Sequence, residues 1–282
     1  MWNCNIDHLT IYHYEQEVSL EPHIIRQFPR LDRFRRLISS EINIDPTPQG
    51  HFAGIDAFGN QVDQIWFLGK HAHLKIHAKI SLQIEAYNPF HFVIFPIDAM
   101  EQKYYQSVLL PKALAPYTEK PEGSDEEAKL IASCLEKGKG EVIPFLHEMT
   151  RHIYVNFQGE ERELGPAKAP GQTIQDGKGT CRDLSVLFIQ LCRLCRIPAR
   201  FTSGYHIQTE NKSELHAWAE VFIFGAGWVG FDPSMGTLCN WRYLPLASGI
   251  EQQDTMPVSG SFFGAGNSRL DSKIMVQLIK QA

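Results

Sequence analysis

The residues from His73 to Ala86 alternate almost strictly between polar and apolar side chains. A period of two places every apolar side chain on one face of a β-strand. Strands with one apolar and one polar face are typical of antiparallel sheets that cover a core on one side only. The segment therefore predicts a half-buried strand, with Leu74, Ile76, Ala78, Ile80, Leu82, Ile84 and Ala86 on its apolar face.

Shorter apolar runs at residues 6–14 and 61–68 predict further strands in the same region. The sequence DAFGN at residues 56–60 predicts a turn between them. We therefore expect residues 1–95 to form a β-rich N-terminal domain, followed by a second domain over residues 96–282.

The second domain is expected to begin with helices. Residues 96–123 contain several prolines and are predicted to be a connection. Ser124 and Glu127 have the spacing of a capping box, and Gly138 is a suitable helix end. A second helix is predicted over residues 144–157, and the Gly-, Pro- and charge-rich residues 159–179 are predicted to be loop.

A third helix is predicted to begin at Cys181. Thr180 and Asp183 have the spacing of a helix N-terminus, and Pro198 is expected to end the helix. Apolar residues cover most of its circumference, which is typical of a central, mostly buried helix. Further strands are expected at residues 199–207, 216–224, 227–233 and 272–281.

Composition and charge narrow the class of protein. The chain has 282 residues, a net charge of -5 and a pI near 6.2, and it lacks the basic stripe expected of a nucleic-acid partner. No apolar run approaches the roughly 20 residues that span a bilayer, and the N-terminus does not resemble a secretory signal. Six cysteines do not form a disulfide-like spacing pattern. We expect a cytoplasmic protein with no membrane association; the sequence does not indicate its oligomeric state.

The position of Cys181 suits a nucleophile. At the start of a helix, its sulfur lies beside free backbone N–H groups and the positive end of the helix dipole. Both effects favour thiolate over thiol. The alternative is a small residue that is merely tolerated at a helix start.

A thiol nucleophile needs a base, and the base needs an orienting group. His216 begins one predicted strand, and Asp232 ends the next. In a hairpin centred on residue 224 they lie directly opposite; in one centred on residue 225 they are two residues out of step, about 7 Å along the strand. Both registers keep the two side chains on one face. Taken singly, His216 also fits an exposed strand-end histidine, and Asp232 fits a turn residue before Pro233.

Three stretches resemble the transglutaminase-like cysteine-enzyme superfamily in its bacterial branch. They are GTCRDLSVLFIQLCRLCRIPARFTSGY, LHAWAEVFIFGAGWVGFDPS and the β-rich start with DAFGN. The resemblance implies an α+β fold, in which an antiparallel β domain precedes a papain-like core over residues 96–282. In that core a central helix packs against an antiparallel sheet.

The resemblance also implies a catalytic triad with Cys181 as nucleophile, His216 as base and Asp232 as orienting acid. The expected reaction is attack on an amide or peptide carbonyl of a protein or peptide substrate, through a thioester. Neither a metal nor an organic cofactor is implied. Alternatives are transglutaminase activity, glycopeptide amidase activity, or a peptide-binding module without catalysis.

Other residues have competing interpretations. Residues 151–180 lack the tryptophan that eukaryotic transglutaminases use near the transition state, which leaves the backbone N–H of Cys181, Gln172 and Gln175 as oxyanion candidates. Cys192 and Cys195 have a C-x₂-C spacing without a second ligand pair, which favours core packing over zinc. Trp218 and Trp228 are expected to pack on the sheet, although both also fit a substrate cleft.

Overall fold

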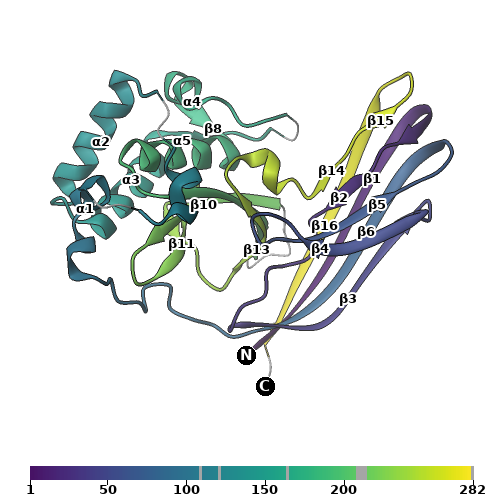
Figure 1. Ribbon diagram of the computed structural model, residues 1–282, viewed down its shortest axis with the longest axis horizontal. Coiled ribbons are helices and arrows are strands. Elements are labelled where there is room, and N and C mark those ends of the chain that lie inside the picture. Colours follow the sequence, from purple (N-terminus) through teal and green to yellow (C-terminus); the bar gives the residue numbers. More distant parts are fainter. Residues whose placement is uncertain (108–109, 120–121, 163–164, 208–214, 281–282) are drawn as a thin grey trace.

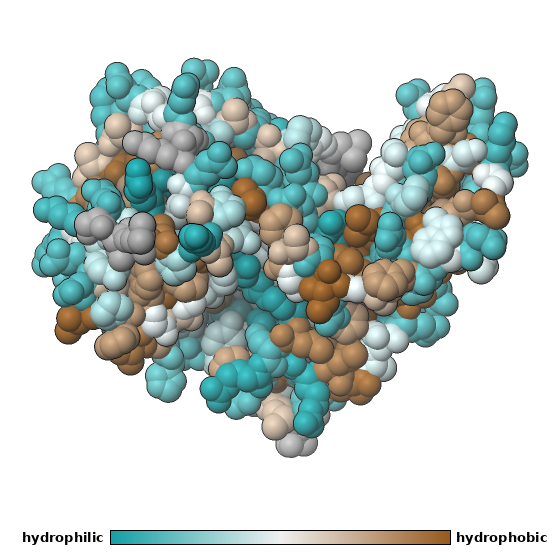
Figure 2. All heavy atoms as spheres, in the orientation of Figure 1, coloured by the Kyte–Doolittle hydropathy of each residue, from teal (hydrophilic) through white to brown (hydrophobic). Residues whose placement is uncertain are grey.

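The computed structural model describes residues 1–107, 110–119, 122–162, 165–207 and 215–280. Figure 1 shows a rounded part of helices and sheet beside a set of long, projecting strands. Figure 2 shows the same two parts as a filled surface, with a notch between them at the upper edge. The α+β prediction is confirmed, with antiparallel sheets formed largely by the N-terminal region and a helix-and-sheet core after it.

The projecting strands form one long antiparallel sheet. Strand β1 (Trp2–Leu20) lies between β6 (His71–Ile84) and β16 (Ser268–Lys280), and β3 (Arg35–Asp45) pairs with the other edge of β6. The short β15 (Phe262–Phe263) pairs with the end of β1. The first and the last of the described strands therefore lie side by side in the same sheet (Figure 1).

The alternation that predicted β6 is seen in its burial. The side chains of Leu74, Ile76, Ala78, Ile80, Leu82 and Ile84 are all at most 2% exposed. Their polar neighbours lie on the opposite face and are half-buried or exposed. Ala86 lies beyond the end of the strand and is exposed, because the pairing with β1 and β3 stops at Ile84.

A second sheet covers part of the first. Its order is β14 (Val258–Ser259), β2 (His23–Ile25), β5 (Gln61–Trp66) and β4 (Gly50–Ile55). The predicted turn before β5 is present: the Asp56 carboxylate accepts hydrogen bonds from the backbone N–H groups of Phe58 and Asn60. Gly59 has φ +84°, a left-handed conformation that glycine adopts without strain.

The core contains more helix than the sequence predicted. Its helical elements are η1 (Ile97–Met100), α1 (Gln102–Ser107), η2 (Lys112–Thr118), α2 (Asp125–Lys137), α3 (Val142–Asn156), α4 (Pro170–Asp176), α5 (Cys181–Leu194) and η3 (Gln252–Thr255). The predicted capping box of Ser124 and Glu127 begins α2. Short helices interrupt the expected connection at residues 96–123.

The expected loop at residues 159–179 is also partly regular. It contains α4, a helix of seven residues, which is too short to show a helical period in sequence. Strands β7 (Gln158–Gly159) and β8 (Lys178–Gly179) pair in parallel on either side of this segment. The chain entering α5 is therefore hydrogen-bonded to the chain leaving α3.

The core sheet has the order β12 (Thr237–Leu238), β11 (Gly227–Asp232), β10 (Leu215–Ile223), β9 (Ala199–His206) and β13 (Tyr243–Gly249). Helix α5 packs on it, as expected for a central helix. Leu184, Leu187 and Phe188 of α5 share a buried cluster with Ala219 and Phe231 of the sheet.

The C-terminal strand pairs with the first strand of the chain. A strand was expected at residues 272–281 without a stated partner; β16 spans Ser268–Lys280 and pairs with β1 over thirteen residue pairs, and residue 281 lies outside the described residues. The division at residue 95 stays a prediction, but β14, β15 and β16 hydrogen-bond to strands of the N-terminal region. Among the described residues, no helix is both long and apolar enough to cross a bilayer.

Candidate active site

Helix α5 begins where the sequence predicted, with Cys181 as its first residue. The hydroxyl of Thr180 accepts a hydrogen bond from the backbone N–H of Asp183, whose carboxylate Oδ2 accepts the backbone N–H of Thr180 at 2.8 Å. This reciprocal capping box fixes the first turn. The Cys181 side chain is half-buried beside that turn.

Asp183 also holds the preceding loop against the helix start. Its Oδ1 accepts hydrogen bonds at 2.7 Å from Arg162 Nη2 and from the backbone N–H of Lys168. The carboxylate is fully buried, and burial alone raises its pKa; the bonds from Lys168, Thr180 and Arg162 outweigh burial and lower the pKa. The capping role proposed from spacing is thus part of a larger set of contacts that hold the turn before the thiol.

The hairpin of β10 and β11 adopts the second of the two expected registers. Ile223 pairs with Gly227 and Ala219 with Phe231, so the turn is centred on residue 225. His216 and Asp232 are consequently two residues out of step. Because both lie at the same end of the hairpin and on one face, their side chains still meet.

The imidazole of His216 and the carboxylate of Asp232 form a hydrogen bond of 2.7 Å between Nε2 and Oδ2. The two residues are 8% and 0% exposed. The Cys181 side chain lies beside His216 and acts with Asp232 to raise the pKa of the imidazole. Since Nε2 is engaged by Asp232, Nδ1 is the ring nitrogen left for the sulfur.

The structure therefore brings together all three residues singled out in the sequence. Burial lowers the pKa of His216, but the bonds and charges of Asp232 and Cys181 outweigh it and raise the pKa from 6.5 to about 10. At neutral pH the imidazole is charged. A charged imidazole beside a sulfur stabilises thiolate, because opposite charges attract strongly where water is excluded.

Asp232 is held by donors on both oxygens. Oδ1 accepts hydrogen bonds from the backbone N–H and the hydroxyl of Ser234, and from the backbone N–H of Met235. The hydroxyl of Tyr243 donates to Oδ2 at 2.9 Å. Burial raises the pKa of Asp232, but the bond to His216 and the other donors outweigh it, so the pKa lies below its usual value.

Sequence reasoning missed Ser234 and Tyr243. Ser234 follows Asp232 by two residues, a spacing at which an aspartate commonly bonds the backbone ahead of it in a turn, so this contact had a local signal. Tyr243 arrives from β13, which is not a neighbour of β11 in the sheet. No local pattern indicates such a contact.

His206 is a second histidine next to the site. Its ring stacks on Tyr243, with centroids 4.3 Å apart, and lies 5.4 Å from the ring of His216. Burial first, and the charge of His216 next, lower the pKa of His206 to about 4. His206 is therefore neutral while His216 is charged.

Of the proposed oxyanion donors, two are side chains exposed to solvent. Gln172 donates a hydrogen bond to Asp176 within α4, and Gln175 is exposed on the same helix. The backbone N–H of Cys181 lies in the first turn of α5, where no intrahelical acceptor exists for it. The assignment of this N–H as an oxyanion donor stays a prediction.

Of the remaining candidates, Cys192, Cys195 and Trp218 pack in the interior, and Trp228 is half-buried. Cys192 and Cys195 are 0% and 3% exposed within the core, where burial raises the pKa of Cys192 well above its usual value. Trp218 is 2% exposed and packs with Cys239 and Tyr243. Trp228 lies under the guanidinium of Arg200, whose carbon is 4.2 Å from the ring centroid. No group of three metal-binding side chains occurs in the described part of the chain.

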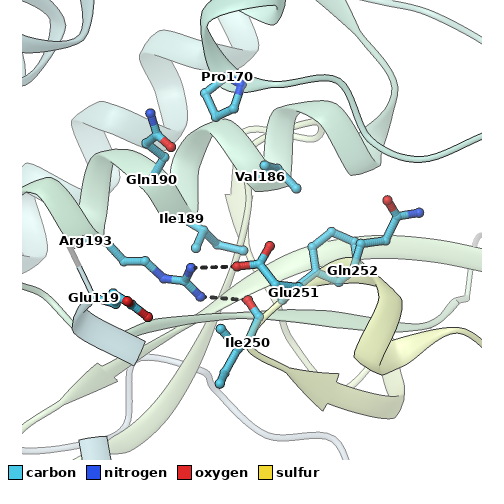
Figure 3. A pocket seen from close by; sticks show the side chains of 10 residues that line it. Glu119, Pro170, Val186, Ile189, Gln190, Arg193, Ile250, Glu251 and Gln252 are labelled. Carbon is cyan, nitrogen blue, oxygen red and sulfur yellow. Dashed lines mark hydrogen bonds and ion pairs between the residues drawn. The ribbon is translucent and has the colours of Figure 1, made fainter. Parts of the chain in front are cut away.

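A cavity of about 390 Å³ lies along α5, away from the triad. Figure 3 shows Arg193 reaching across it to the Glu251 carboxylate and the Ile250 carbonyl. None of the three candidate catalytic residues lines it. The Arg193 guanidinium is already bonded to protein acceptors, including the Ala199 carbonyl.

Two families match the chain. Residues 4–83 match the bacterial transglutaminase-like N-terminal region, and residues 120–233 match the transglutaminase-like superfamily. The second range contains Cys181, His216 and Asp232. The first range covers strands β1 to β6 almost completely.

Relatives are similar along nearly the whole chain. An uncharacterized protein of Mycobacterium leprae is 22% identical over 292 residues, covering 100% of both chains. An uncharacterized protein of Mycobacterium tuberculosis H37Rv is 23% identical and covers 96% of this chain and 91% of its own. The crystal structure of a candidate cysteine protease from Cytophaga hutchinsonii has a TM-score of 0.72 over 100% of this chain and 92% of that chain, at 16% identity. This likeness concerns the fold, and it includes the projecting sheets.

Proposed function

The chain belongs to the transglutaminase-like superfamily, with a bacterial transglutaminase-like N-terminal region, and we propose that it is a cysteine-dependent hydrolase of peptide or amide bonds. One observation carries the proposal: the His216 imidazole is bonded to Asp232 at 2.7 Å and has the Cys181 side chain beside it. A thiol, a base and an orienting carboxylate in series are what nucleophilic acyl transfer requires.

The first half of the reaction acylates the enzyme. The Cys181 thiolate attacks the carbonyl carbon of the substrate and forms a C–S bond, while the carbonyl electron pair moves to oxygen. That pair then returns, the C–N bond breaks, and the His216 imidazolium gives its proton to the leaving amine. A thioester on Cys181 and a neutral imidazole remain.

The second half restores the enzyme. The neutral His216 takes a proton from water, whose oxygen attacks the thioester carbon. Collapse of this second tetrahedral adduct breaks the C–S bond and releases the carboxylic acid. The thiolate and the imidazolium are then paired again. The net reaction consumes one water molecule and needs neither metal nor organic cofactor.

Asp232 supports both halves through His216. Its 2.7 Å bond to Nε2 keeps that nitrogen protonated and turns Nδ1 toward the sulfur. It also stabilises the positive charge that the ring carries in the resting state. The backbone N–H of Cys181 is the natural donor to the developing oxyanion, because it lies free at the positive end of α5.

The substrate is proposed to be a protein or peptide. The test is a peptide library incubated with wild type and with Cys181→Ala, with and without a primary amine, and read by mass spectrometry. The proposal expects cleavage or deamidation products from wild type alone, independent of the added amine. Covalent addition of the amine would instead support a transglutaminase, and release of sugar-linked amines from glycopeptides would support an amidase. Binding by both proteins without any product would support a peptide-binding module.

A further inference from the structure

We propose that Tyr243 is a positioning residue of this site: it holds Asp232 in line with His216 and limits how tightly the carboxylate retains the imidazolium proton. The inference rests on the proposed function. Its basis is a shared atom, because Tyr243 Oη lies 2.9 Å from Asp232 Oδ2, the same oxygen that accepts the His216 Nε2 bond.

Tyr243 acts only as a donor in this bond. Its side chain is buried, with the residue 3% exposed, and both burial and the charge of Asp232 raise its pKa far above the usual range. The hydroxyl therefore keeps its proton between pH 7 and 10, the range of the experiment described below. A donor on Oδ2 withdraws negative charge from that oxygen and weakens its hold on a second donor.

The tyrosine ring has little freedom to leave this position. One face stacks on His206, with an interplanar angle of 17°, and Trp218 packs against the ring at 5.4 Å and 77°. Gly204 permits this close packing, because a Cβ there would lie 2.7 Å from the Trp218 ring and 2.1 Å from the Leu244 carbonyl.

The N-terminal region also reaches Tyr243. Arg35, on β3, is 6% exposed, and its Nη2 donates a hydrogen bond to the backbone carbonyl of Tyr243 at 2.7 Å. The long sheet is thereby attached to the residue that contacts Asp232. The N-terminal region is thus connected to Asp232 through the Arg35 side chain and then through the backbone and side chain of Tyr243.

Several ionisable groups surround His216, and each must be considered in a pH experiment. Asp232 bonds it, Cys181 lies beside it, His206 and Tyr243 lie against its ring, and the buried Cys239 lies near Asp232. His206 has a pKa of about 4, and burial raises the pKa values of Tyr243 and Cys239. His216 is the group bonded to the same Asp232 oxygen as Tyr243, so its charge is the one on which the Tyr243 hydroxyl acts directly.

The test compares alkylation of Cys181 by iodoacetate and iodoacetamide as a function of pH. Iodoacetate carries a negative charge that the imidazolium attracts, so the ratio of the two rates falls as His216 loses its proton. In Tyr243→Phe, Asp232 loses a donor and becomes more basic. The midpoint of that fall is expected to move upward by roughly half a pH unit or more, since hydrogen bonds to charged groups are strong.

A second substitution, expected to move the midpoint in the opposite direction, distinguishes the positioning role from a folding defect. Site-specific 3-fluorotyrosine at position 243 is a better hydrogen-bond donor, and it is expected to move the midpoint downward. Tyr205→Phe is the matched control: Tyr205 is fully buried on β9 and bonds His8 Nδ1 at 2.8 Å, outside the triad. It should reproduce any general loss of stability without moving the midpoint.

The outcomes separate the two proposals. Opposite shifts in the two Tyr243 proteins, with no shift in Tyr205→Phe, support the positioning role. An unchanged midpoint in both Tyr243 proteins overturns it and leaves the proposed function standing. A wild-type protein whose rate ratio does not vary with pH contradicts the proposed function itself.

Discussion

His216 and Asp232 are bonded at 2.7 Å although they lie two positions out of step in the β10–β11 hairpin. Asp232 lies one residue beyond the last pair of β10 and β11, Ala219 with Phe231, and the turn through Ser234 and Met235 bonds its other oxygen. The register thus gives the orienting acid both its histidine and its own supporting donors.

Removing the charge of Asp232 is expected to slow alkylation of Cys181. Asp232→Asn keeps the shape of the side chain but loses the charge that stabilises the imidazolium. Hydrogen bonds to charged groups contribute about 1.5–3 kcal/mol, which corresponds to a rate loss of about 10- to 100-fold at neutral pH. The iodoacetamide rate constant of Cys181, followed by peptide mass spectrometry, measures the loss.

Asp254→Asn is the matched control for that variant. Asp254 caps η3 by accepting the backbone N–H of Glu251 at 2.9 Å and is not part of the triad. Its substitution should leave the rate unchanged. Equal rates in Asp232→Asn and wild type would show that the carboxylate does not support the imidazolium.

The stability of the fold should depend on pH through His216. The folded pKa of about 10 lies above the unfolded value of 6.5, because Asp232 and Cys181 outweigh the effect of burial. The folded state therefore binds the proton more tightly, and this stabilisation is complete below about pH 6.5. It should be lost progressively as the pH rises from 6.5 toward 10.

The measurement is the free energy of unfolding in urea across that pH range, for wild type and His216→Gln. The difference between the two should shrink as the pH rises. His147→Gln, an exposed position on α3, should follow wild type. A wild-type-minus-variant difference that stays constant with pH would contradict a charged imidazole at neutral pH.

A buried ion cluster should contribute strongly to the attachment of the N-terminal segment. Glu220, 4% exposed, bonds Arg30 of that segment and Arg200 and Ser248 of the core, and the two guanidinium groups hold the pKa of its carboxyl low despite burial. Glu220→Gln leaves the buried Arg200 and the Arg30 side chain, which is 34% exposed, without a charged partner, and it should destabilise the fold by about 3 kcal/mol, the lower end of the range for a fully buried pair. Urea denaturation checks this value.

The same variant separates attachment from catalysis. In buffer without urea, and at a temperature at which Glu220→Gln remains folded, the pH profile of Cys181 alkylation should match that of wild type, since Glu220 does not bond the triad. Glu41→Gln, which changes an exposed carboxylate on β3, is the control for charge alone. A stability loss below 1 kcal/mol would mean that the cluster does not hold the two regions together.

The C-terminal strand is expected to be essential for a soluble N-terminal sheet. A chain that ends at Asn267 lacks β16 and leaves the edge of β1 opposite β6 unpaired from Trp2 to Tyr14. Long open strand edges pair with other chains, so the truncated protein should associate and melt at lower temperature. Size-exclusion chromatography and thermal unfolding test this, with a chain ending at Lys280 as control. A monomeric truncated protein with the wild-type Tm would contradict it.

Much of the fold was predictable wherever a local pattern determines it. The alternation in β6 and the caps of α2 and α5 depend on residues within a few positions of one another. The pairing of β16 with β1 depends on residues more than 250 positions apart, and the sequence of β16 shows only that it is a strand. Helix α4 was missed because seven residues beginning with Pro-Gly show no helical period.

The residues of the candidate site also divide into those with a local sequence signal and those whose contacts depend on distant parts of the chain. The helix start singled out Cys181, and the side-chain parity of the hairpin predicted that His216 and Asp232 share a face; the resemblance implied that the three act together. The first two signals are local, and the family match over residues 120–233 includes all three residues. Tyr243 and His206 could not be found in this way, since their contacts depend on how β9 lies beside β10 and β13 beside β9.

The rate of Cys181 alkylation by iodoacetamide, compared with the other five thiols and with His216→Ala, tests the account most directly. A thiol paired with a charged imidazole should react rapidly already at neutral pH, and this advantage should disappear in His216→Ala. The buried Cys4, Cys134, Cys192, Cys195 and Cys239 should react slowly in both proteins. Labelling of Cys181 that is no faster than theirs, or that is unchanged by His216→Ala, would contradict the proposed enzyme.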